Sequence, residues 1–158
     1  IHDTPNAEQL ANIAIGIAST VKELGYKPRV ALLSFSNFGN LSRPSSKDLK
    51  EAVNILDKKQ VDFEFDGEMT PEVALDYDLI KENYPFCRLS GPANVLIMPS
   101  LLAANISFKL LQKLSGGSIL GPLMIGGEKP FQIVQMGSSV SDIVNSASIA
   151  TYNAIFSE

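Results

Sequence analysis

Short apolar runs of strand length alternate along this chain with segments whose apolar residues recur every three or four positions. The clearest run is 29–35 (RVALLSF), which is rich in Val and Leu. Further strand candidates are 62–66, 94–98, 119–125 and 131–134. Strands that alternate with helices favour a parallel sheet, because parallel neighbours need a long and usually helical crossover. We therefore expect an α/β fold, a three-layer α/β/α unit around a mostly parallel sheet.

Helix signals separate these runs. The first helix is expected to have Thr4 as its cap and Pro5 at its first position, and to end before Gly25. Its apolar stripe would consist of Leu10, Ile13, Ala14, Ile17, Val21 and Leu24. Further helices are expected from about Pro44, after Thr70-Pro71, over 101–114, and from Ser139 to about Phe156. At the start of the last helix, Ser139 and Asp142 have the spacing of a capping box.

Composition narrows the classes of function. The 158 residues fit one domain, or one compact unit with a short appendage. A hydrophobic fraction of 45% excludes disorder as the dominant state. The 13 basic and 17 acidic residues argue against a nucleic-acid partner, which needs a large basic face. A single cysteine, Cys87, excludes a disulfide framework, and a single histidine, His2, excludes the HExxH zinc motif.

The chain shows no segment for membrane insertion or export. No apolar run approaches the ~20 residues of a membrane-spanning helix, and no signal peptide is visible. We expect no membrane partner and a cytoplasmic location. Because the chain begins at Ile1 and not at methionine, it is expected to be a fragment of a longer product.

The best candidate for a binding site follows the strand at 29–35. Its residues are Ser36, Asn37, Phe38, Gly39 and Asn40. In open α/β sheets ligands bind beyond the carboxyl ends of the strands, and small polar residues there can offer hydroxyl and N–H groups to an anion. Arg43 and Lys47 would add positive charge. Composition alone favours a second interpretation, that the same residues are only turn formers and caps.

An acidic segment follows, with eight carboxylates and one lysine over 62–82. Asp66 and Glu68 flank Gly67, a pairing that would suit a metal or acid–base chemistry. The spacing matches no EF-hand, and no histidine is near. Such charge runs are usually a solvated face, which is our expectation here.

The remaining polar residues give weaker signals. Cys87 stands between Phe86 and Arg88 with no histidine to pair with it, so we expect a structural thiol. Asn105 and Lys109 lie four apart on an expected helix and share a face from which both could reach a ligand. The glycine pairs at 116–117 and 126–127 match neither GxGxxG nor the Walker A pattern.

Whole segments of the chain carry a resemblance to a known family. They are AEQLANIAI (7–15), PRVALLSFSNFG (28–39), DGEM (66–69), the stretch 84–114, GPLMIGGEKP (121–130) and SSVSDIVNSASIA (138–150). In this order they resemble the phosphate acetyltransferase family, and in particular the phosphotransacetylase-like C-terminal domain of bacterial NADP-dependent malic enzymes. SNFG and DGEM look like the malic-enzyme version. Stand-alone transferases tend to carry a Ser-Thr-Gly-Thr-type loop and DGP at these places.

The resemblance implies an architecture and a parent reaction. The family fold has two α/β lobes with a cleft between them and is related to the isocitrate dehydrogenase fold. Residues 1–124 would be the second lobe, and residues 125–158 the C-terminal segment that returns to the first. The second lobe would supply the contact of a homodimer or higher homo-oligomer. The parent would decarboxylate malate oxidatively to pyruvate with NADP and a divalent metal in its upstream domains, and this fragment would hold no cofactor.

The resemblance also implies a site. The transferases place a Ser-Arg-Gly motif before the final helix and an aspartate at its start; here Gln135, Met136 and Gly137 stand at the motif, and Asp142 at the aspartate. Met136 cannot replace the charge and bidentate hydrogen bonds of arginine. We therefore expect no catalytic residue here but a regulatory and oligomerisation module that responds to acetyl-CoA or a related CoA ester. Its ligand-binding residues would be Ser36, Asn37, Gly39, Asn40, Asn105, Lys109, Gln135, Met136 and Asp142.

The residues leave two alternative functions open: an active phosphate acetyltransferase, and a purely structural dimerisation domain. Asp142 likewise has a second interpretation, since a carboxylate at a helix N-terminus is a common cap.

Overall fold

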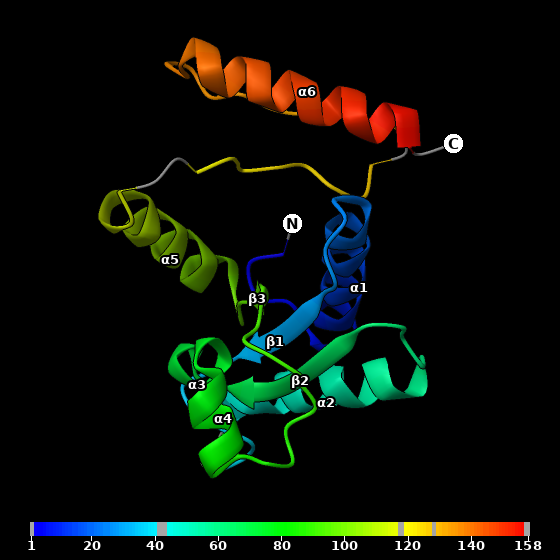
Figure 1. Ribbon diagram of the computed structural model, residues 1–158, viewed down its shortest axis with the longest axis vertical. Helices are drawn as coiled ribbons and strands as arrows, with labels where there is room; N and C mark the ends of the chain where they lie inside the picture. The colour runs from blue at the N-terminus through cyan, green and yellow to red at the C-terminus, as the bar shows by residue number, and fades with distance from the viewer. Residues whose placement is uncertain (1, 41–43, 117–118, 128, 157–158) are drawn as a thin grey trace. The chain divides into compact units, whose positions relative to one another are not determined.

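The computed structural model describes residues 2–40, 44–116, 119–127 and 129–156 (Figure 1). Arg43, which was expected to add charge to the loop after the first strand, lies outside these ranges. The chain divides into two compact units, Ile1–Phe108 and Lys109–Glu158. Each unit is described by itself below.

The first unit is built on a parallel sheet of three strands in the order β2-β1-β3. β1 is Arg29–Leu33, β2 is Glu64–Met69 and β3 is Val95–Ile97. The strands expected at 29–35 and 94–98 are confirmed. The strand expected at 62–66 begins two residues later and continues through the DGEM sequence. It is also more deeply buried than the half-exposed strand that its alternation predicts, because both of its faces are covered.

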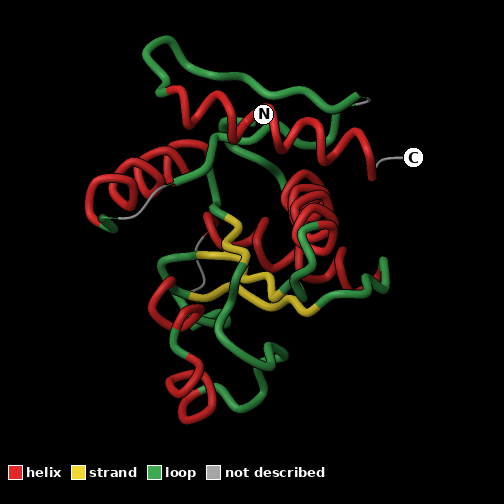
Figure 2. Tube along the Cα trace, turned by 45° about the horizontal axis from the view of Figure 1, so that its top comes forward, coloured by secondary structure: helices red, strands yellow, loops and turns green. Residues whose placement is uncertain are grey.

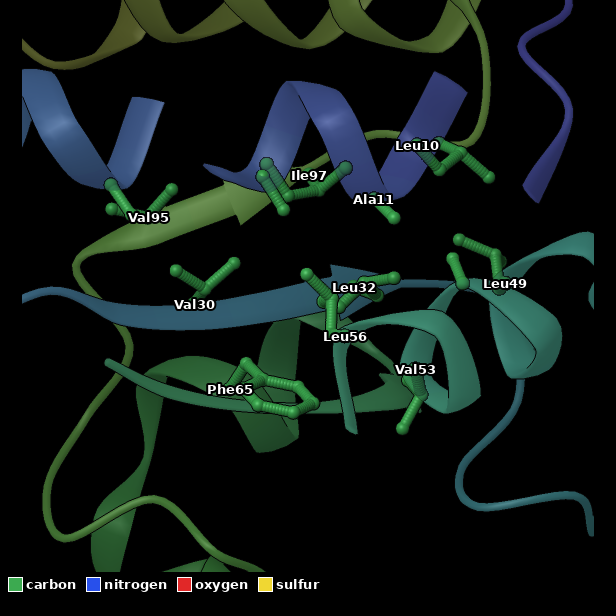
Figure 3. Packing of buried hydrophobic residues seen from close by; sticks show 13 residues of the cluster. Leu10, Ala11, Val30, Leu32, Leu49, Val53, Leu56, Phe65, Val95 and Ile97 are labelled. Atoms are coloured by element: carbon green, nitrogen blue, oxygen red, sulfur yellow. The ribbon is translucent and has the colours of Figure 1, made fainter. Parts of the chain in front are cut away.

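Helices cover both faces of this sheet, as the three-layer prediction requires. α1 (Ala7–Glu23) and α2 (Pro44–Lys58) pack on one face, against Val30 and Leu32 of β1. Figure 3 shows these side chains meeting those of the two helices. α3 (Pro71–Leu75) and α4 (Tyr77–Asn83) pack on the other face, against Ala31 and Leu33. The alternation along β1 follows from the period of two in a strand.

The start of α1 corrects one prediction. Its cap is Asn6 and not Thr4: Asn6 Oδ1 accepts the N–H of Gln9 at 2.9 Å, and Gln9 Oε1 accepts the N–H of Asn6 at 3.0 Å. This reciprocal pair satisfies two donors that the first turn leaves free, which a cap at Thr4 would not do. Ile13, which was expected on the buried stripe, is exposed. Small side chains take its place in the core, namely Ala7, Ala11, Ala14 and Ala18.

β2 contains a bulge that decides where the later side chains point. The register with β1 pairs Leu32 with Gly67 but Leu33 with Met69, so Glu68 is an extra residue on β2. A one-residue slip moves the following side chains to the opposite face of a sheet. Phe65 accordingly packs with α1 and α2, whereas Met69 packs with α3 and α4.

α5 (Leu101–Leu114) has the bounds that the sequence predicts, and the boundary between the two units falls within it. α6 (Val140–Phe156) follows the expected capping box. The segment between them contains no strand among its described residues, and Figure 2 draws it as loop.

The strands expected at 119–125 and 131–134 are therefore wrong. A strand needs a neighbouring backbone to pair with, and Pro122 lacks the N–H group that a ladder requires. Met124 instead pairs with a side chain: its N–H donates to Gln132 Oε1 at 2.9 Å, and its carbonyl accepts from Gln132 Nε2 at 3.1 Å.

The second unit leaves its apolar side chains accessible. None of its described residues is buried. Among the exposed ones are Leu110, Leu111, Leu114, Ile133, Val140, Val144 and Ile155. Within the described part of the chain, no helix is both long enough and apolar enough to cross a membrane.

Candidate functional site

The loop after β1 lies where the sequence predicts a site, at the carboxyl end of the sheet. It continues the contact between the two neighbouring strands, because the Ser34 N–H donates to the Met69 carbonyl at 2.8 Å and the Phe38 N–H donates to the Glu68 carbonyl at 2.6 Å. The loop SNFGN and the sequence DGEM are thus brought together across 29 or more positions of the chain. Parallel pairing makes this meeting possible, since the carboxyl ends of both strands lie at one edge.

Glu68 is the centre of this arrangement. Its side chain is 0% exposed. Oε1 accepts hydrogen bonds from the hydroxyl of Ser36 and from the N–H of Gly39, each at 3.2 Å. Oε2 is buried and has no hydrogen-bond partner within the described part of the chain. The bulge at Glu68 aims this carboxylate at the loop.

Lys50 of α2 supplies the positive charge at the loop. Its Nζ lies 4.0 Å from Glu68 Oε1, and its side chain is 41% exposed. A Cβ on Gly39 would come within 2.8 Å of the same ammonium group, and Gly39 has a φ of +85°. The positive φ favours glycine at this position, whereas the flexible end of the Lys50 side chain could shift to make room for a Cβ. Lys47, the lysine expected in this role, has an exposed side chain.

Asn37 fastens the loop to the next helix. Its Oδ1 accepts the N–H of Thr70, the cap of α3, at 2.7 Å, and its carbonyl accepts the N–H of Asn40 at 3.0 Å. Four of the expected site residues are thus brought together in one loop: Ser36, Asn37, Gly39 and Asn40. The hydrogen bonds described for these residues are made to other groups of the chain, as the turn-former interpretation also expects.

The acidic segment is mostly the solvated face that was expected, since five of its eight carboxylates are exposed, but Asp66 and Glu68 are buried. Asp66 Oδ2 accepts the backbone N–H of Arg88 at 2.8 Å, and Asp66 Oδ1 lies 3.3 Å from the guanidinium of the same residue. That guanidinium also pairs with Asp57 at 2.5 Å and lies 4.4 Å from the ring centroid of Phe65. Burial lowers the pKa of Arg88, but the Asp66 and Asp57 carboxylates outweigh it and raise that pKa. The pairing serves the fold, because a buried carboxylate needs a partner.

Cys87 lies beside this network and is half-buried. Burial raises the pKa of its thiol to about 11, and the Asp66 carboxylate acts in the same direction. The thiol is therefore protonated at neutral pH, which agrees with the expected structural role and not with a nucleophile. The described residues contain no group of three or more His, Cys, Asp or Glu that could hold a metal ion.

The other expected site residues lie outside the loop. Asn105 and Lys109 are exposed on α5. Gln135 and Met136 belong to the turn before α6 in the second unit; the carbonyl of Gln135 accepts the hydroxyl of Ser138 at 2.7 Å, and Met136 is fully exposed.

Asp142 caps α6. Its Oδ2 accepts the hydroxyl of Ser139 at 2.7 Å and the N–H of Ser139 at 3.0 Å, while its own N–H donates to Ser139 Oγ at 3.2 Å. These hydrogen bonds lower the pKa of Asp142. The capping interpretation is confirmed, and it accounts for the carboxylate without a ligand.

Sequence reasoning did not predict that Glu68 and Lys50 lie at the loop, although it noted Glu68 as one of a pair of carboxylates. Lys50 lies one turn after Lys47 on the predicted helix, so the helical period offered a signal. The contact of Glu68 with the loop had no local signal, because it depends on a bulge and on pairing with a distant strand.

Comparison with known proteins agrees with this fold. The sequence model of the family described as "Phosphate acetyl/butaryl transferase" matches residues 1–151. The chain therefore belongs to this family, as the resemblance of its segments predicts.

Its relatives include two kinds of protein. The chain is 53% identical over 154 residues to an NADP-dependent malic enzyme of Rhizobium meliloti (strain 1021), covering 98% of this chain and 20% of the relative. It is 39% identical over 149 residues to a phosphate acetyltransferase of Treponema pallidum (strain Nichols), covering 92% of this chain and 44% of the relative. The chain thus spans about a fifth of that malic enzyme and less than half of that transferase.

Solved structures show the same architecture. A phosphotransacetylase from Streptococcus pyogenes matches with a TM-score of 0.91 and 33% identity, covering 98% of this chain and 47% of that one. EutD phosphotransacetylase from Staphylococcus aureus matches with a TM-score of 0.88 and 30% identity, covering 98% and 48%.

Proposed function

We propose that this chain is part of a non-catalytic, acyl-CoA-responsive regulatory and oligomerisation module of an NADP-dependent malic enzyme. The observation that carries the proposal is the uncharged side chain of Met136. By the family resemblance, the transferases hold an arginine there that serves CoA and phosphate chemistry. Met136 is uncharged and makes none of the charge-assisted hydrogen bonds of arginine. Identities of 53% and 48% with two malic enzymes support the choice of parent.

The ligand in this proposal is acetyl-CoA or a related CoA ester. The loop residues Ser36 to Asn40 would face its phosphate or thioester end, and Asn105 and Lys109 would contact it from α5. The exposed ammonium of Lys109 suits an anionic group of CoA as a point charge. The resemblance adds the segment from Gln135 to Asp142.

The parent reaction would be oxidative decarboxylation of malate to pyruvate. We assign its NADP and divalent metal to the upstream malic enzyme domains. The sequence has no Rossmann or Walker A fingerprint, and the described residues offer no metal-binding cluster of acidic, histidine or cysteine side chains.

The second part of the proposal is association into a homodimer or higher oligomer. It is supported by the many exposed large apolar side chains of α5 and α6, because extensive exposed apolar surface usually marks an interaction site. Sedimentation of the complete protein should show a dimer or larger species. A monomer at micromolar concentration would contradict this part.

The ligand proposal is tested by titrating acetyl-CoA into the complete protein while malate-dependent NADPH formation is followed. We expect the rate to change with acetyl-CoA, and Lys109→Ala to weaken this response about tenfold, the value of one charge-assisted hydrogen bond. Lys113→Ala is the matched control, since Lys113 is an exposed lysine one turn further along α5. Equal responses in all three proteins would exclude the assigned role of Lys109.

Two other functions compete with this one. The solved transferases with TM-scores of 0.88 and 0.91 favour an active phosphate acetyltransferase, which a coupled assay of acetyl-CoA formation from acetyl phosphate and CoA would reveal. A purely structural dimerisation domain would bind no CoA ester, and equilibrium dialysis with acetyl-CoA would show this.

A further inference from the structure

Phe38, in the middle of the loop after β1, has a backbone conformation that bulky residues rarely adopt. Its φ is +48°, in the left-handed region, where a Cβ is disfavoured. Gln60 is the other described residue besides glycine with a positive φ, and it follows the end of α2, where left-handed residues are common. Phe38 follows a strand and not a helix, so other contacts must hold its conformation.

Two aromatic rings from the turn after α4 contact the side chain of Phe38. The centroid of the Phe38 ring lies 5.1 Å from that of Tyr84 and 4.9 Å from that of Phe86, with 78° between the planes of the second pair. These distances are typical of favourable ring pairs. Phe38 and Tyr84 also pack against the core on the α3 and α4 face, whereas Phe86 is 64% exposed. Phe86 therefore contacts Phe38 from outside the core.

The turn that carries these rings is itself attached to α4 and to the sheet. The N–H of Tyr84 donates to the carbonyl of Ile80 at 2.8 Å, and the N–H of Cys87 donates to the carbonyl of Tyr84 at 2.9 Å. The N–H of Arg88 donates to the Asp66 carboxylate of β2 at 2.8 Å. The rings are thus held at a place other than the loop, which allows them to keep the loop in a conformation that it would not favour alone.

We propose that Phe38 is a positioning residue that fixes the loop after β1, and that the rings of Tyr84 and Phe86 hold it in its left-handed conformation. The φ of Phe38 sets the direction of the chain between Asn37 and Gly39, because the two backbone dihedrals of a residue orient everything that follows it. The fixing of the loop rests on contacts within this chain. That the fixed loop then faces a CoA ester is a further step, which rests on the proposed function.

The first test is amide hydrogen exchange of the complete protein, read at the N–H groups of Phe38 and Gly39, which donate to Glu68. Phe86→Ala removes one ring contact at an exposed position, so exchange at both N–H groups should rise about fivefold, the equivalent of one aromatic pair. Tyr26→Ala is the matched control and should leave this exchange unchanged. Tyr26 is 67% exposed and precedes β1, at the opposite end of the strand from the loop.

Unchanged loop exchange in a folded Phe86→Ala protein would overturn the positioning role. An equal rise throughout β1 would also overturn it, because it would indicate only a loss of global stability. Phe38→Gly keeps the proposal testable if Phe86→Ala does not fold. Glycine adopts a positive φ freely, so this variant keeps the backbone conformation accessible but loses the ring that Tyr84 and Phe86 hold. Exchange at Gly39 should rise in this variant too, and the absence of a rise would contradict the proposal.

The step to the CoA ester is tested by the response of malate-dependent NADPH formation to acetyl-CoA. The acetyl-CoA concentration at half-maximal response should rise about fivefold in Phe86→Ala and stay unchanged in Tyr26→Ala. Equal concentrations in the wild type and Phe86→Ala would contradict this step. If the wild type itself does not respond to acetyl-CoA, the proposed function fails, whereas the hydrogen-exchange result still decides the positioning role of Phe38.

Discussion

The first unit contains a buried apolar core, whereas none of the described residues of the second unit is buried. Leu32 of β1 is 0% exposed, but Leu111 of α5 is 56% exposed. Both lie in regular secondary structure, so the difference does not come from local conformation. The first unit therefore forms a hydrophobic core of its own. The side chains of α6 and of the second half of α5 are not buried by the described residues of their unit. In the proposed function, the exposed apolar side chains of α5 and α6 would be covered when the protein associates into a homodimer or higher oligomer.

The largest expected effect is a difference in the free energy of unfolding between two matched substitutions, one in each unit. Leu32→Ala should reduce the free energy of unfolding by about 3 kcal/mol, because it leaves a cavity in the sheet core. Leu111→Ala should change it by less than about 0.5 kcal/mol, since little apolar surface is buried there. Urea denaturation followed by circular dichroism measures both. Similar losses in the two variants would mean that α5 is packed as tightly as the sheet.

A smaller effect is expected at Glu64, at the start of β2. Its carboxylate accepts the N–H and the hydroxyl of Ser90 at 2.8 Å and pairs with Lys27. Burial raises the pKa of Glu64, but the Lys27 and Ser90 hydrogen bonds outweigh it and lower the pKa to about 2. A folded-state pKa below the unfolded one contributes stability that is present above the unfolded pKa and is lost as the pH falls toward 2.

Glu64→Gln should therefore cost about 2 kcal/mol at pH 7, a value that allows for solvent screening of the exposed Lys27. The difference between wild type and variant should shrink as the pH falls from 4.5 toward 2. Denaturation midpoints measured across this range test the sign. A difference that stays constant down to pH 2 would show that the charge of Glu64 is not what stabilises the strand.

The smallest effect concerns the start of α1. Asn6→Ala removes the cap and should cost about 1 kcal/mol. Thr4→Ala is the control and should be neutral within a few tenths of a kcal/mol, because Asn6 and not Thr4 caps the helix. Thermal unfolding of both variants measures the pair, and a larger loss at Thr4 would restore the cap that the sequence first indicated.

Much of the first unit follows from local pattern. β1, α2 and α5 have periodicity strong enough to predict, and the Thr70-Pro71 and Ser139-Asp142 signals mark helix starts correctly. The expected strands at 119–125 and 131–134 fail for a physical reason, since an apolar run becomes a strand only when another strand pairs with it.

The site was only partly predictable. Glu68 and Asp142 show why, because each carboxylate accepts a serine hydroxyl and a backbone N–H. The partner of Asp142 is three residues away and visible as a motif. The partners of Glu68 are about 30 residues away along the chain. Only the pairing of β1 with β2 reveals that the buried Glu68 carboxylate lies against the loop.

In the proposed function, this family member does not transfer acetyl groups. The direct measurement is the coupled assay of acetyl-CoA formation from acetyl phosphate and CoA, made on the complete protein beside an active phosphate acetyltransferase. We expect no turnover above the uncatalysed rate, because the family resemblance implies that Met136 stands where the transferases have an arginine. Turnover comparable to that of the transferase would contradict it.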